Sequence, residues 1–211
     1  MSQPIFIVNN SNVSSDDVAS MTAAVQAQLD GPFQSAWRDT AQLTIDSPPP
    51  GAIVLSVEQT SDVPGALGYH DLGSDGAPFG KIFVDDSAAA GVPLSAVLSH
   101  EVLEMVIDLY VDVNAVLDNG DGTGTLYALE DCDPVEADAY QDGNGVTLSN
   151  FVFPAWFQKD APPPYDAAGN LSAPFSMTPG GYVITRQVNF TSDWQQQFAD
   201  KSKTRSRFGR K

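Results

Sequence analysis

Basic residues are scarce in this sequence, and most of them lie at one end. Of 211 residues only 10 are Lys or Arg, against 27 Asp or Glu, so the formal net charge is −17. Residues 1–200 contain four of the basic residues and all 27 acids, which gives this region a net charge of −23. Such an acidic region repels nucleic acid and anionic membranes and attracts cations. We therefore expect neither nucleic acid nor a membrane as its partner.

Cysteine and long apolar segments are also rare. The single cysteine, Cys132, excludes an internal disulfide. No apolar run approaches the ~20 residues that a bilayer-crossing helix needs. The N-terminal residues lack the basic segment and long apolar stretch of a secretory signal. These absences predict a cytoplasmic protein.

The remaining six basic residues form a cationic tail at 201–211 that contains no acid. Short charged ends of this kind are commonly solvated. The alternative is a binding segment, which would hold the acidic surface of a second copy or of another partner. The sequence leaves both interpretations open.

Apolar spacing and turn residues predict an α+β fold in which a mixed sheet packs on two helices. Residues 1–117 form the N-terminal half, and a mostly extended, β-rich half at 118–200 completes the same domain. The expected helices span 15–30 and 94–111, with a short third helix at 192–200. The expected strands span 4–8, 41–45, 52–57, 66–70, 80–84, 125–129, 135–140, 146–153 and 182–188.

The most informative segment lies in the expected helix 94–111 and reads VLSHEVLEMVI. At 3.6 residues per turn, His100 and Glu104 share one face, and Glu101 lies about 100° away. The other residues of the segment are nearly all apolar, which predicts a helix buried on most sides. Buried carboxylates without a partner cost several kcal/mol, roughly. A bound divalent cation would offset their charge.

A simpler interpretation gives this helix no ion. His100 would then be a hydrogen-bonded core residue, and the two acids would lie at a solvated edge. Similarly, Trp156 and Tyr182 offer aromatic surface for a sugar or another ligand, although only composition supports that idea.

A third ligand is expected from the acid-rich stretch EDCDPVEAD that follows the helix. Glu130 and Glu136 have the longer side chains and are the first candidates, with Asp133 as the alternative. Pro134 argues against one continuous helix through all three residues. His70 ends an expected strand and ranks behind these acids.

The spacing of this helix resembles the HExxH motif of zincin metallopeptidases, and the order of elements over 4–111 resembles the N-terminal half of that class. Here the second His is replaced by Glu104, which gives HExxE. The resemblance implies His100 and Glu104 as metal ligands and Glu101 as the general base of a peptidase acting on peptides or proteins. It implies zinc, whereas a carboxylate ligand also admits calcium, manganese or iron.

The segments HEVLEMVID, CDPVEAD and NFVFPAWF together resemble a group of uncharacterised proteins of bacteria and tailed phages. That resemblance implies an alternative function as a structural or assembly protein of the virion, with an inactive zincin-like fold. Tail 201–211 would then contact a second copy or a virion partner, and the protein would be located in the virion.

Overall fold

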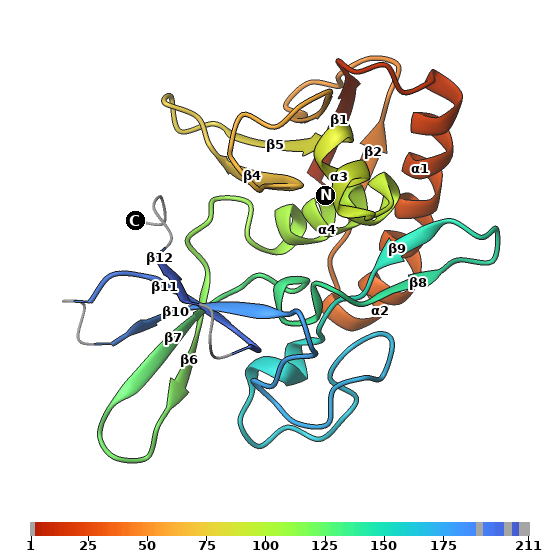
Figure 1. Cartoon of the computed structure of the whole chain (residues 1–211). Coiled ribbons are helices and arrows are strands. Elements are labelled where there is room, and N and C mark those ends of the chain that lie inside the picture. The colour runs from red at the N-terminus through yellow and green to blue at the C-terminus, as the bar shows by residue number, and fades with distance from the viewer. Residues whose placement is uncertain (1–2, 189–191, 201–203, 207–211) are drawn as a thin grey trace. The chain divides into compact units, whose positions relative to one another are not determined.

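The computed structural model describes residues 3–188, 192–200 and 204–206. Its fold is α+β, as the sequence predicts. The chain forms two compact units (Figure 1). The first unit comprises Met1–Tyr110 and Tyr140–Ser149, and the second comprises Val111–Ala139 and Asn150–Lys211. The expectation that 1–117 and 118–200 complete one domain stays a prediction.

A five-stranded mixed sheet forms the centre of the first unit. Its strands, in spatial order, are β2 (Ala41–Thr44), β1 (Gln3–Asn9), β3 (Ile53–Glu58), β5 (Pro78–Phe83) and β4 (Gly68–Leu72). The first four strands pair in parallel, whereas β4 pairs antiparallel with β5 at the sheet edge. Buried residues such as Ile5 and Leu55 form its core, and apolar burial of this kind fixes which face of a strand points inward.

Helix α1 (Ser15–Gln28) begins where the sequence predicts, because the Ser14 hydroxyl accepts a hydrogen bond from the Asp17 amide. Its regular part ends at Gln28, two residues before the predicted residue 30. The chain continues through a π-helical turn, Leu29–Phe33, into the short helix α2 (Gln34–Trp37). Pro32 lies inside this turn and has no amide hydrogen, so the regular α-helical bonding cannot continue there.

Helix α4 (Leu94–Ile107) follows α3 (Val84–Ala90) and packs against β4, β5 and α1 (Figure 1). The contact with β5 is close, since a Cβ atom on Gly80 would lie 2.8 Å from Met105 Sδ. The helix ends four residues before the predicted residue 111. Asp108 already has non-helical backbone angles (φ −137°, ψ 53°), and Val111 adopts a positive φ of 54°.

The hairpin of β8 (Ala139–Gln141) and β9 (Thr147–Ser149) is fixed to α1 and α4 by a buried polar network. Ser99 Oγ donates to Gln28 Oε1 at 2.6 Å and accepts from the Ser149 amide at 3.1 Å. Gln28 Nε2 donates to the Ser149 carbonyl at 2.9 Å. These bonds constrain the rotation of α4 about its axis, and Ser99 directly precedes the predicted site residue His100.

The second unit contains an antiparallel sheet and two short 3₁₀ turns. Its strands, in order, are β12 (Thr204–Ser206), β11 (Gln195–Phe198), β10 (Tyr182–Gln187), β7 (Gly124–Ala128) and β6 (Asn114–Asp118). The turns are η2 (Asp133–Val135) and η3 (Pro154–Phe157). The predicted helix at 192–200 is wrong, because residues 195–198 form a strand that pairs with β10.

Most of the predicted tail 201–211 lies outside the described residues, and of it only the backbone of β12 is described. No single helix in the described part of the chain is long and apolar enough to cross a membrane. Helices α3 and α4 reach that length and apolarity only as a pair bent by 114°.

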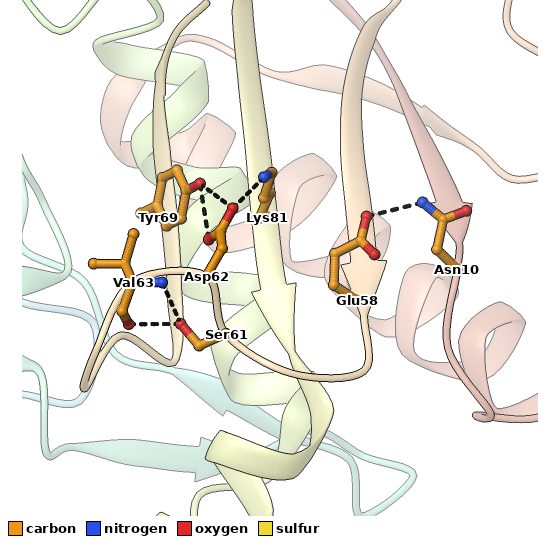
Figure 2. A network of polar contacts seen from close by, with 7 residues as sticks. All are labelled: Asn10, Glu58, Ser61, Asp62, Val63, Tyr69 and Lys81. Atoms are coloured by element: carbon orange, nitrogen blue, oxygen red, sulfur yellow. Dashed lines mark hydrogen bonds and ion pairs between the residues drawn. The ribbon is translucent and has the colours of Figure 1, made fainter.

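Asp62, in the loop between β3 and β4, contacts side chains of β4 and β5 (Figure 2). Tyr69 on β4 donates its hydroxyl to the Asp62 carboxylate at 3.1 and 3.2 Å, and Lys81 on β5 forms an ion pair with Asp62. The hydrogen bond from Lys81 lowers the pKa of Asp62, and the same bond raises the pKa of Lys81. This network links the loop to β4, the edge strand, and to β5.

We expect Asp62→Asn to lower the free energy of unfolding by less than about 1 kcal/mol at neutral pH, because the Asp62 and Lys81 side chains are 49% and 28% exposed and water screens their attraction. The lowered pKa of Asp62 means that its contribution is present above the unfolded pKa of about 3.9 and is lost as the pH falls through the folded value. The raised pKa of Lys81 means that the contribution is lost at alkaline pH. Urea unfolding between acidic and neutral pH measures the difference, with exposed Asp46→Asn as the control. Equal pH profiles for both variants would contradict the prediction.

Candidate metal centre

Helix α4 presents His100 and Glu104 on neighbouring turns, as their spacing predicts. His100 Nε2 lies 3.3 Å from Glu104 Oε1. The His100 side chain keeps 13% of its surface exposed, whereas the Glu104 side chain keeps 5%. The pair therefore combines a partly accessible imidazole with a buried carboxylate.

Glu101 points toward the edge strand β4, where a glycine makes room for it. A Cβ atom on Gly68 would lie 2.7 Å from Glu101 Oε1 and 2.9 Å from Glu101 Cγ. Glu101 is only 5% exposed. Its Oε2 atom is buried and accepts no hydrogen bond from any residue that the structure describes. A buried carboxylate oxygen in this state favours a positively charged neighbour.

His70 on β4, which the sequence ranks behind the acids of the stretch 130–138, is a neighbour of Glu101 and Glu104. It is 4% exposed, and its Nδ1 atom lies 3.5 Å from Glu101 Oε2 and 3.7 Å from Glu104 Oε2. Gly68 and His70 are two residues apart on one strand and therefore share the face toward α4, whereas Tyr69 points to the other face. The alternation along the strand can be predicted from the sequence. It identifies His70 as a neighbour of α4 only once β4 is known to pack against that helix.

Three of these side chains form a group that could hold a metal ion. The ligand atoms of His70, Glu101 and Glu104 all lie within 4.8 Å of one another, and all three residues are buried. The group contains one nitrogen and two carboxylate ligands, which suits zinc, manganese or iron. Within the first unit, the structure therefore places Glu101 and Glu104 beside His70, whereas His100 lies beside Glu104.

The predicted third ligands belong to the second unit. Glu130 is 3% exposed and follows β7, whereas Glu136 is exposed and caps the end of η2. Asp133, the alternative, is 2% exposed and begins η2. Pro134 lies in this three-residue turn, so no continuous α-helix joins the three acids, as the sequence predicts. Their role as metal ligands stays a prediction.

No protein-family model, no curated protein and no solved structure matches this chain.

Proposed function

We propose that the protein is a zincin-like metal-binding protein that holds a divalent ion, zinc in the first place, at His100 and Glu104. It would act in the cytoplasm, or in the virion if the gene belongs to a phage. The observation that carries this proposal is the 3.3 Å separation of His100 Nε2 and Glu104 Oε1 on consecutive turns of the buried helix α4.

This separation fits two ligands of one ion. Nitrogen and oxygen ligands lie about 2.1 Å from zinc, so two of them at a tetrahedral angle are about 3.4 Å apart. The side chains also fit chemically, because a neutral imidazole and a carboxylate are both ordinary zinc ligands. Glu130, Glu136 or Asp133 remains the proposed source of a third ligand.

The further proposal is that this centre hydrolyses peptide bonds. A bound divalent ion makes water a stronger nucleophile and polarises a carbonyl group. Glu101 directly follows His100, and its carboxylate is the proposed acceptor of the proton from the attacking water. Gly68, which has no Cβ atom, leaves the room on β4 that the Glu101 carboxylate occupies. The order of strands and helices before α4 is the order expected from the zincin resemblance and supports the proposal.

The proposal is tested first by zinc content. Purified protein is dialysed against Zn²⁺, freed of excess metal and analysed for zinc per chain. We expect His100→Gln to lose about one ion relative to the wild type. The same zinc content in both forms would show that His100 holds no ion. Glu58→Gln, which changes a carboxylate on β3, is the matched control for zinc held loosely by the acidic surface.

The hydrolytic step is tested separately with Glu101→Gln. Turnover of a fluorescent casein substrate should fall by roughly 10²- to 10⁴-fold if Glu101 is the general base. Equal turnover in the wild type and the variant would exclude that role. Glu58→Gln again serves as the control and should leave turnover unchanged.

A further inference from the structure

We propose that a second divalent cation binds inside the first unit, in the triangle formed by His70 Nδ1, Glu101 Oε2 and Glu104 Oε2. This position is distinct from the proposed His100–Glu104 position, although the two share the Glu104 carboxylate. It is a site of the edge strand β4 and the helix α4 together, because His70 comes from the strand and both acids come from the helix.

The distances in this triangle fit a shared cation better than direct hydrogen bonds. A protonated imidazole bound to a carboxylate normally lies about 2.7–2.9 Å from the acceptor oxygen. His70 Nδ1 instead lies 3.5 Å from Glu101 Oε2 and 3.7 Å from Glu104 Oε2. Ligands about 2.1 Å from a common ion are about 3.4 Å apart at a tetrahedral angle and about 3.6 Å apart at a trigonal one.

Burial and charge support the same conclusion. The side chains of His70, Glu101 and Glu104 are 3%, 7% and 5% exposed. With a neutral imidazole, the triangle carries two negative charges in a region that water hardly reaches. Such charges are costly unless an ion or a proton offsets them. Glu101 Oε2 is directed at this triangle and accepts no hydrogen bond from the described part of the chain.

A glycine on β4 also makes room for this group of side chains. At Gly68 any larger residue would put its Cβ atom 2.7 Å from Glu101 Oε1 and 3.0 Å from Val97 Cγ1. The Glu101 carboxylate therefore lies against the strand backbone, with its other oxygen turned toward His70. The glycine and the histidine, two residues apart on one face, together form the strand side of the triangle.

The two oxygens of Glu104 separate the two positions. Oε1 lies 3.3 Å from His100 Nε2, whereas Oε2 lies 3.7 Å from His70 Nδ1. A carboxylate that faces two imidazoles in this way can bridge two ions, and ions in two-metal sites are about 3.5–4 Å apart. We call the position between His70, Glu101 and Glu104 the inner position. Because Glu101 Oε2 belongs to it, the Glu101 carboxylate either holds the ion there or accepts a proton from water, and it does not do both at once.

The test measures bound zinc in the full chain after dialysis against Zn²⁺. We expect about two ions per chain in the wild type and about one in His70→Gln. Glu101→Gln replaces one carboxylate oxygen with an NH2 group and keeps the size of the side chain nearly the same. We expect this variant to lose the same ion. Circular dichroism shows whether each variant is folded, and Glu101→Gln carries the test if His70→Gln is not. Glu58→Gln is the control for zinc bound to surface acids.

The outcomes separate this inference from the proposed function. If His70→Gln and Glu101→Gln keep the full zinc content, the inner position is refuted, whatever His100→Gln does. If both lose an ion while His100→Gln matches the wild type, the inner position stands and the proposed function loses its metal site. If His70→Gln is destabilised but keeps its zinc, a proton on His70 offsets the two acids and the inference is wrong.

Discussion

Replacing Glu104 with Gln should remove most of the zinc that the protein binds. Glu104 faces His70 with one carboxylate oxygen and His100 with the other, so it belongs to both proposed metal positions. An amide supplies no negative charge and only one good acceptor oxygen. We expect the zinc affinity of each position to fall by more than roughly 100-fold, since even changes beyond the direct ligands cost 10- to 100-fold.

The same substitution should abolish stabilisation by zinc. A ligand that binds only the folded state adds about 2.7 kcal/mol to the free energy of unfolding when its free concentration is 100 times its Kd. Two positions would together add about 5 kcal/mol to the wild type. Urea unfolding with and without Zn²⁺ measures this gain. We expect a large gain in the wild type, a partial gain in His100→Gln and His70→Gln, and almost none in Glu104→Gln.

A matched comparison makes this result specific to Glu104. Glu58→Gln makes the same chemical change on β3, away from α4, and should keep the whole gain. A zinc-dependent gain of equal size in Glu104→Gln and the wild type would contradict both metal positions at once. Both positions would also be contradicted if zinc stabilised neither the wild type nor any variant.

The helix that carries the candidate site could be predicted from the sequence, because the features that indicate it lie within the helix itself and directly before it. A long apolar segment after Pro93 predicts a buried helix, and His100 and Glu104 share a face in any helix with 3.6 residues per turn. The structure has this helix at Leu94–Ile107, with Glu101 and Glu104 buried. Its end was predicted less well, because the hydrophobic pattern continues to Val111 although the backbone turns away at Asp108.

The position of His70 could not be predicted, because it depends on pairing between distant strands. His70 is 30 residues from His100 in the sequence, and only the antiparallel pairing of β4 with β5 brings it beside α4. A single sequence shows that His70 lies on a strand but not which strand lies at the sheet edge. The same limit applies to β11, where the residues QQQF have no strong preference and become a strand through pairing with β10.

Gly181→Ala should have the largest effect on the stability of the second unit. A Cβ atom at this position would lie 2.2 Å from the Pro134 carbonyl oxygen and 2.7 Å from its carbon. These are backbone atoms in the η2 turn, and the same carbonyl already accepts a hydrogen bond from the Thr178 amide at 3.0 Å. Neither segment can move without breaking contacts between η2 and β10, so we expect a loss of about 3 kcal/mol.

Tryptophan fluorescence during urea unfolding reports on this change, because Trp156 and Trp194 are buried in the second unit. Gly143→Ala is the matched control: it lies in the exposed β8–β9 turn, and its added methyl group would meet nothing within 4 Å. We expect that variant to differ from the wild type by less than about 0.5 kcal/mol. If the two variants unfold at the same urea concentration, the close contact between Gly181 and Pro134 does not hold in solution. Then η2, which begins at Asp133 and is followed by Glu136, is not fixed to β10 as described.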